Sequence, residues 1–280
     1  MNQIPRNLIR HLEWTHGQQT PEKKSGPRAK STSPTPPKEQ GQIILAGDLS
    51  KYIQVGIDGL HGNPVVISPF ELEGYDNKDY NNTHTKLLNS GLYMPTPRIF
   101  TTHFKNVIDA FHEEKKLLYA DGSEVPKTLV EEMYKHYTTD FKDIYGHGNS
   151  GAWTWLNARF VEGTGWHDLN LETVVGLEAG KKKKFEVHTV PLEKCVWDDG
   201  YVSLECNGQG LAKKKSRSQE YKQGKNMYFF HPQQNAVARF YAGSGWAGLD
   251  CDWDPAYRDA SLGVFGCAEG MREKIKETIK

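Results

Sequence analysis

Two segments with helical periodicity, followed by a long series of short β-type runs, constrain the fold of this chain most strongly. Large apolar residues recur three or four positions apart over 100–111 and again over 129–141. This spacing is typical of amphipathic helices that cover one face of another element. In the second segment Thr128 and Glu131 match a capping box. We therefore expect two helices, joined by a turn-rich connection over 119–127.

Short runs rich in β-branched and aromatic residues make up most of the remaining sequence, and they predict strands. The expected strands cover 42–47, 52–57, 64–70, 152–163, 169–178, 184–192, 227–231, 236–243 and 262–268. Along 152–163 the side chains alternate, with Trp153, Trp155 and Asn157 on one face and Leu156, Ala158 and Phe160 on the other. The polar segment 73–84 predicts a loop. Helices followed by strands favour an α+β domain with a mostly antiparallel sheet.

The N-terminal region differs from the rest in composition. Residues 17–41 are rich in Pro, Ser, Lys and Gly, so they cannot bury enough apolar surface to offset their ordering entropy. We expect a flexible tether over 1–41, one domain over 42–270 and a charged tail over 271–280. The N-terminus lacks the apolar core of a signal peptide, and no run approaches the roughly 18 apolar residues that span a membrane.

The charge balance argues against a nucleic-acid partner. The chain has 35 basic and 35 acidic residues and a formal net charge of zero, whereas nucleic-acid binders usually carry a basic excess. The lysine clusters at 181–184 and within 211–226 are interpreted as solvated turns. We expect no nucleic-acid partner and no membrane insertion.

Three aspartates in alternation, Asp250, Asp252 and Asp254, resemble the start of an EF-hand calcium loop. That loop requires Gly at its sixth position and Glu at its twelfth, and this chain has Pro255 and Ser261 there. The EF-hand is therefore excluded, and a looser divalent site is the less favoured alternative. We expect no metal and no cofactor.

The cysteines give no catalytic signature. Four residues (Cys195, Cys206, Cys251 and Cys267) contain no C-x-x-C pair, so four buried thiols are favoured over one or two disulfides. His231 with the last two cysteines fits no zinc-ligand spacing. A Cys nucleophile with a His base stays open, because such residues meet in space and not in sequence. No catalytic residue is assigned.

The segment 235–268 has an unusual composition. It contains no Lys, Glu, Gln or Met, although these residues are common elsewhere in the chain, and it is filled with Asp, Gly, Ala, Tyr and Trp. Tyr and Trp supply rigid contact area and Gly, Ser and Asp supply adaptable polar contacts, as in binding loops. The alternative is a Gly- and Trp-rich strand–loop–strand that packs its own core.

This segment resembles the variable region of diversity-generating retroelement variable proteins, especially the archaeal and viral type. The residues that resemble the fixed frame are 235–240, Ala242, Ser244, Ala247, Leu249, Cys251, Pro255, Arg258 and 260–265. The residues that match variable positions are Tyr241, Gly243, Gly245, Gly248, Asp250, Asp252, Asp254, Ala256, Tyr257 and Asp259. The resemblance is most specific over 236–280 and weaker back to residue 85.

In such systems an error-prone reverse transcriptase randomises template adenines, mainly in AAC or AAT codons. Tyr, Gly, Asp, Ala and Ser can result, whereas Lys, Glu, Gln, Met and Trp cannot. The resemblance therefore accounts for the missing residue types. Trp246 and Trp253 depart from it: they are either fixed or derived from an AGG codon, and the protein sequence leaves both alternatives open.

The resemblance implies a C-type lectin-like fold, often of the formylglycine-generating-enzyme-like subclass, with two early helices and a β-rich second half. Sugar binding does not carry over, because the calcium-lectin motifs EPN, QPD and WND are absent. Catalysis does not carry over either. The enzyme of this subclass uses a close Cys pair, and Cys251 and Cys267 are too far apart in sequence to match it.

We therefore expect a non-enzymatic display protein that binds a protein target, such as a host or cell-surface receptor, from a virion or from the cytoplasm before assembly. The expected binding residues are Tyr241, Gly243, Gly245, Trp246, Gly248, Asp250, Asp252, Trp253, Asp254, Ala256, Tyr257 and Asp259. Their four aspartates predict an acidic surface and a basic or hydrogen-bond-donating target. The alternatives are a structural virion or scaffold protein, and an enzyme of the formylglycine-generating or another Cys/His type.

Overall fold

The computed structural model describes residues 49–138, 141–142, 148–149, 151–178, 184–259 and 262–269. All of them belong to one compact unit, Gln42–Lys280. The expected tether over 1–41, the expected strand over 42–47 and the expected tail over 271–280 lie outside the described residues.

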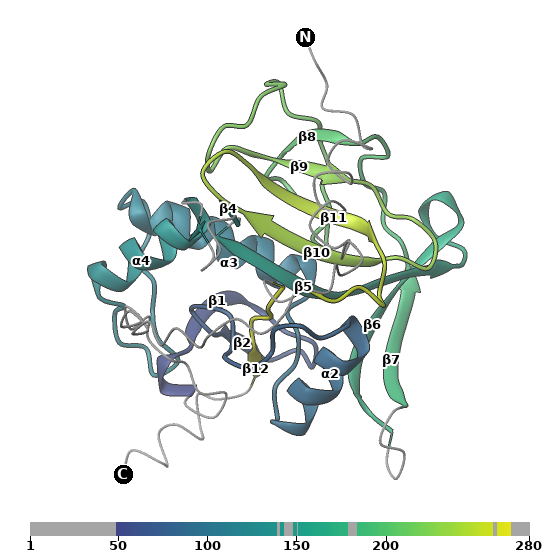
Figure 1. Ribbon diagram of the computed structural model, residues 1–280, viewed down its shortest axis with the longest axis horizontal. Coiled ribbons are helices and arrows are strands. Elements are labelled where there is room, and N and C mark those ends of the chain that lie inside the picture. Colours follow the sequence, from purple (N-terminus) through teal and green to yellow (C-terminus); the bar gives the residue numbers. More distant parts are fainter. Residues whose placement is uncertain are drawn as a thin grey trace, which may run out of the picture. The chain divides into compact units, whose positions relative to one another are not determined.

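A seven-stranded sheet forms the centre of the fold (Figure 1). Its strands are β7 (Phe185–Pro191), β6 (Leu169–Leu177), β5 (Ala152–Glu162), β10 (Val237–Ala242), β11 (Ala247–Trp253), β9 (Asn226–Phe230) and β8 (Gly200–Ser203), in that spatial order. Among these neighbours β11 and β9 run parallel, and the other adjacent strands are antiparallel. The structure confirms an α+β architecture, with a mixed sheet.

Two smaller sheets complete the β structure. One contains β1 (Ile53–Asp58), β2 (Pro64–Ile67) and β12 (Cys267–Glu269), all antiparallel. The other is a ribbon of β3 (Phe141–Lys142) and β4 (Gly148–Asn149). The described elements also include two short 3-10 turns, η1 (Leu49–Lys51) and η2 (Trp166–Asp168). Because β12 pairs with β2, the end of the described chain is joined to its beginning.

The two expected helices are present as α3 (Pro97–Phe111) and α4 (Lys127–Thr138). Thr96 caps α3 by accepting from the Ile99 amide, and Pro97 occupies its first turn. Its apolar stripe is buried: the rings of Phe100 and Phe104 lie 4.9 and 5.0 Å from the ring of Phe240 on β10. The helix therefore covers one face of the large sheet.

Two sequence predictions about helices and loops need correction. The segment 73–84 is not all loop, because helix α2 (Tyr80–Asn89) begins within it. Its buried face carries Tyr80, Thr83 and His84 beside Leu87, and these polar side chains hid the helical period. In α4, Thr128 lies inside the helix and not at its cap, because the Pro126 carbonyl accepts from Val130 and starts the helix one residue earlier.

Two predictions about strands also need correction, and one strand is more deeply buried than alternation alone indicates. In β5, Trp155 and Asn157 are fully buried, as are Leu156, Ala158 and Phe160 on the expected opposite face. The reason is that β5 lies between two apolar clusters, one of which contains Trp155 and the other Leu156 and Phe160. The expected strand 262–268 is reduced to β12 and an isolated bridge at Gly263. Strands β8 and β11 were not predicted.

Candidate binding surface

The segment 235–253 forms a hairpin in the middle of the large sheet. Strand β10 pairs with β5 on one side and with β11 on the other, and all six of its residues are buried. At the tip the Gly243 amide donates to the Trp246 carbonyl at 2.9 Å. Ser244 and Gly245 are exposed there, and Gly245 has open space around it. The middle of the unusual segment is thus a strand pair with a short exposed tip.

The hairpin divides its side chains between two environments. Along the two strands Ala238, Phe240, Ala242, Ala247, Leu249 and Cys251 belong to the main apolar core. The alternate residues Arg239, Tyr241, Gly248 and Asp250 lie on the opposite face, because successive strand side chains point in opposite directions. The first set consists entirely of residues that resemble the fixed frame, and three of the four in the second set match variable positions.

An aromatic row crosses five strands on this opposite face. In strand register Trp153 lies beside Tyr241, Tyr241 beside Gly248, Gly248 beside Tyr228, and Tyr228 beside Tyr201. Directly paired residues share a face of the sheet. The Tyr201 and Tyr228 rings meet edge to face with centroids 5.2 Å apart.

Gly248 leaves the space that Tyr241 occupies. A Cβ atom added to Gly248 would lie 2.1 Å from the Tyr241 hydroxyl oxygen and 2.2 Å from the ring carbon that bears it. The Tyr241 ring therefore lies across the backbone of β11 and continues to the Trp246 ring, 4.3 Å away between centroids. The residue at 248 must stay small for Tyr241 to hold this position.

Arg239 and Asp250 form a buried ion pair in the next row. They are cross-strand partners, with Nε and Oδ2 2.8 Å apart, and each side chain is only 2% exposed. The Arg239 guanidinium carbon lies 3.2 Å from the ring centroid of Trp253 and 4.9 Å from that of Trp153. A paired guanidinium between aromatic rings retains its charge while it is removed from water.

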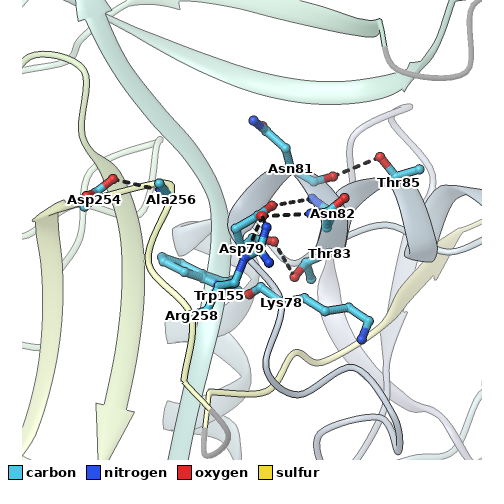
Figure 2. A network of polar contacts seen from close by, with 10 residues as sticks. All are labelled: Lys78, Asp79, Asn81, Asn82, Thr83, Thr85, Trp155, Asp254, Ala256 and Arg258. Atoms are coloured by element: carbon cyan, nitrogen blue, oxygen red, sulfur yellow. Dashed lines mark hydrogen bonds and ion pairs between the residues drawn. The ribbon is translucent and has the colours of Figure 1, made fainter. Parts of the chain in front are cut away.

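The loop after β11 is held against the start of α2 (Figure 2). Asn77 and Tyr80 donate backbone hydrogen bonds to the carbonyls of Asp259 and Pro255, at 3.0 and 3.1 Å. Arg258 donates from Nε to the carboxylate of Asp79 at 3.0 Å, and the same carboxylate caps the helix at the Asn82 amide. Backbone contacts dominate this anchorage, so much of it is independent of side-chain identity.

The expected binding residues fall into three classes of exposure. Gly245, Asp254 and Ala256 are exposed; Trp246, Asp252, Trp253, Tyr257 and Asp259 are partly exposed; Tyr241, Gly243, Gly248 and Asp250 are buried. Two aromatic members of the partly exposed class, Trp253 and Tyr257, are in contact with each other. The Tyr257 ring lies 5.3 Å from Trp253 and 6.3 Å from Trp153 between centroids.

The expected acidity of the surface is therefore corrected. Asp250 is buried and its charge faces Arg239, so it does not contribute to an exposed acidic patch. Asp254 and Asp259 accept hydrogen bonds from the Ala256 amide and the Tyr257 hydroxyl. The sequence shows three alternating aspartates and Asp259, but it does not show that Arg239 pairs with Asp250 across two strands.

Residues outside 235–268 also contribute to this face and were missed. They are Trp153 from β5, Tyr228 and Phe230 from β9, and Tyr201 from β8. The alternation of Met227, Tyr228, Phe229 and Phe230 marks the face that each side chain takes. No local signal shows that β9 pairs in parallel with β11, because that pairing joins segments separated in sequence.

The thiols are largely buried, and His231 has a carboxylate partner. The four cysteines are free, and burial raises the pKa of Cys195 to about 12 and of Cys206 to about 11. Burial also raises the pKa of Cys251 and Cys267 well above the ordinary thiol value. His231 pairs with Asp199, with Nδ1 and Oδ1 2.6 Å apart. The partner of His231 is therefore a carboxylate and not the cysteine pair considered as a zinc site.

No group of three or more His, Cys, Asp or Glu side chains in the described part of the chain is arranged to hold a metal ion. Within the residues that the structure describes, no helix has the length and apolar character needed to cross a membrane. Comparisons with protein-family models, with curated proteins and with solved structures found no match for this chain. Function is therefore inferred from the residues and their geometry.

Proposed function

We propose that this protein displays a binding surface whose side chains are diversified by a retroelement, so that sister proteins recognise different protein targets. The surface is the face of β10, β11 and the following loop that carries Tyr241, Trp246, Trp253 and Tyr257. A virus particle or a cell surface is the setting in which such a module would meet a receptor.

The observation that carries the proposal is the division of labour within the hairpin. Side chains that resemble the fixed frame fill the core, whereas those that match variable positions lie on the other face or at exposed sites. Substitutions at exposed positions usually change stability by less than about 0.5 kcal/mol, while truncation of a buried Leu or Phe costs about 2–5 kcal/mol. The exposed and partly exposed positions of such a surface tolerate diversification without loss of the fold, whereas the buried ones are limited by their neighbours.

We also propose that the domain is a C-type lectin-like fold. Two features support this assignment: helices precede most of the sheet strands, and the hairpin is the centre of a β-rich second half. The closure of β12 onto β1 and β2 is compatible with it. A solved structure superposed on an established member would decide between this fold and another α+β arrangement.

Gene sequencing tests the proposal most directly. The gene and its flank would be sequenced across a population of the source, to find a near-copy of the codons for 235–265 beside a reverse transcriptase gene. We expect differences between copies to be confined to template adenines and to codons of the proposed variable positions. An invariant 241–259 with no copy nearby would instead favour a structural virion or scaffold protein.

A stability comparison tests the division of labour in the purified protein. Gly245→Asn and Ala256→Tyr place residues accessible from adenine-rich codons at exposed sites. Leu249→Ala and Phe240→Ala remove core side chains of the same hairpin. We expect unchanged melting for the first pair and a loss of about 2–5 kcal/mol for the second. Equal losses in both pairs would contradict the separation of surface from frame.

The enzyme alternative has a separate test. A nucleophilic cysteine needs a lowered pKa, and burial moves all four thiol pKa values in the opposite direction. Activity against any candidate substrate that disappears in Cys251→Ser but not in Cys267→Ser would establish a catalytic role.

A further inference from the structure

Arg239 occupies the centre of the proposed surface. In register it lies between Trp155 on β5 and Asp250 on β11, and its side chain is 2% exposed. Arginine cannot lose its proton in a protein, so its positive charge must be balanced wherever it is buried. In this chain the carboxylate of Asp250 lies 2.8 Å from Nε and supplies that balance.

Aromatic rings hold the guanidinium independently of that carboxylate. The centroids of Trp253, Trp153 and Tyr241 lie 3.2, 4.9 and 5.8 Å from the guanidinium carbon. These rings come from β11, β5 and β10, three adjacent strands of the sheet. Stacking on aromatic rings fixes the plane of a guanidinium as well as its position. We therefore expect Arg239 to keep its place when the residue at 250 changes.

The surroundings of Arg239 are rich in hydrogen-bond donors. The indole Nε1 atoms of Trp153 and Trp253 are buried, and neither has an acceptor among the described residues. Indole N–H groups can only donate. These donors belong to rings that flank the guanidinium, and neither donates to the Asp250 carboxylate, so the oxyanion beside Arg239 is bound by the guanidinium.

We propose that Arg239, held between the rings of Trp153, Trp253 and Tyr241, is a built-in carboxylate site in the centre of the surface, and that the side chain at position 250 controls it. Asp250 fills the site with the protein's own carboxylate. A short neutral residue at 250 opens the site to an acidic side chain of a protein target. The inference rests on the proposed function for its biological role, because the retroelement would supply such residues.

The consequence is a rule for the kind of target. Variants with Asp at 250 present a neutralised centre, and they recognise their targets through the aromatic rings and the loop after β11. Variants with Ser, Ala or Gly at 250 present a fixed guanidinium in a partly desolvated setting, where a charge-assisted hydrogen bond is strongest. The codon for residue 250 thus determines whether the surface binds a target with an acidic group opposite Arg239 or a target without one.

The experiment uses the full chain and the acetate ion as the probe. Thermal melting is measured in sodium acetate and in sodium chloride of equal ionic strength for four proteins: wild type, Asp250→Ser, Arg239→Met with Asp250→Ser, and Asp252→Ser. Asp252 is the matched control, because it is the next acid along β11 and is partly exposed. The chloride series corrects for general screening.

We expect Asp250→Ser to melt below wild type in chloride and to recover by about 3–6 °C when acetate is in tenfold excess over its dissociation constant. Wild type, Asp252→Ser and the double variant show no such recovery. The inference is overturned if acetate raises all four equally, or if Asp250→Ser gains nothing. If Asp250→Ser does not fold in chloride but folds in acetate, the result supports the carboxylate site. If Asp250→Ser folds in neither salt while the double variant does fold, the inference is overturned.

This outcome is independent of the gene. If the flank of the gene contains no template copy, the proposed function is rejected, and the carboxylate site is then decided by the melting experiment alone. If a template copy is found but acetate does not raise the melting temperature of Asp250→Ser, the display function is retained and the carboxylate site is rejected.

Discussion

At the scale of single residues, the identity of one side chain on this surface depends on its cross-strand neighbour. Tyr241 lies over Gly248, and the Asp250 carboxylate forms an ion pair with Arg239. Both pairs join β10 to β11 across one hydrogen-bonded ladder. Diversification at these sites is therefore constrained in pairs, whereas the tip residue Gly245 has open space around it.

Gly248→Ala tests the first pair. The new methyl group collides with the Tyr241 ring, so we expect a loss of about 1–3 kcal/mol in the free energy of unfolding. Tyr241→Ala removes the obstacle, and the double variant should be more stable than the sum of the single losses by at least about 0.5 kcal/mol. Urea denaturation of the four proteins gives this coupling. Gly245→Ala is the control and should be neutral.

The buried histidines give the fold a defined sensitivity to acid. His84 on α2 and His103 on α3 are fully buried, and no ring nitrogen of either has a hydrogen-bond partner among the described residues. Burial lowers the pKa of each from 6.5 to about 3. The unfolded state therefore binds more protons than the folded state between these two values. Their contribution to stability is complete above pH 6.5 and falls as the pH drops below it.

We expect the free energy of unfolding to fall by about 1.4 kcal/mol per pH unit for each of these histidines below pH 6.5. Urea denaturation at a series of pH values down to about 5, where most carboxylates are still ionised, measures the slope. His84→Leu and His103→Leu should each reduce this slope by the contribution of one histidine, about 1.4 kcal/mol per pH unit. His188→Leu, at an exposed position on β7, should leave the slope unchanged; an equal effect of all three would contradict the assignment.

At the scale of elements, helix α2 connects the helical half of the domain to the loop after β11. Asp79 caps the helix at the Asn82 amide, 2.8 Å away, and also binds Arg258 of the loop. Partial burial opposes ionisation of this carboxyl, but the hydrogen bonds from Asn82 and Arg258 prevail and lower its pKa. One carboxylate thus stabilises both the helix and the position of the loop.

Asp79→Ala and Asp79→Asn separate these two roles. Asn is as good a cap as Asp, so Asp79→Asn should lose only the exposed ion pair, about 0–1 kcal/mol. Asp79→Ala loses the cap as well, and we expect about 0.5–2 kcal/mol of additional destabilisation. Chemical denaturation measures both. If Arg258→Ala proves more costly than Asp79→Ala, the loop and not the helix cap is the dominant role of this contact.

Predictability from sequence also differs between elements. Helices α3 and α4 were predicted because their apolar residues repeat with a helical period, and β5 because its side chains alternate. Helix α2 was missed because a buried polar face carries no hydrophobic period. Strand β11 was missed because Gly248, Asp250 and Asp252 interrupt the apolar residues that usually mark a strand. Those same residues are the ones that the proposed function explains.

The candidate site follows the same division. Its membership in 235–268 was predicted from composition and resemblance, but its geometry was not. The partnership of Arg239 with Asp250 and the aromatic row over β9 and β8 depend on strand order and register, which are set by contacts between distant segments. Local sequence specifies which residues are unusual, and the register specifies which of them meet.

At the scale of the whole described domain, the loop after β11 is fixed at both ends. Before it, the hairpin lies in the centre of the large sheet; after it, Gly263 bridges to Thr154 of β5, and β12 pairs with β2. Tyr93 also exchanges backbone hydrogen bonds with Cys267. The surface is therefore supported by contacts that span the domain, and its stability should be that of the whole cooperative unit.

Thiol reactivity tests this cooperativity. Cys251 on β11 and Cys267 on β12 are fully buried, Cys195 is nearly so, and Cys206 is partly exposed. Burial raises every one of these thiol pKa values, so little thiolate forms near neutral pH.

With a disulfide reagent we expect one thiol of the native protein to react faster than the others, and this fast reaction should be absent in Cys206→Ser. Cys251 and Cys267 should be labelled together, at the rate of global unfolding measured by fluorescence. Labelling of Cys251 well before Cys267 would show instead that β11 opens by itself, and that the surface is a local unit of low stability and not part of the cooperative core.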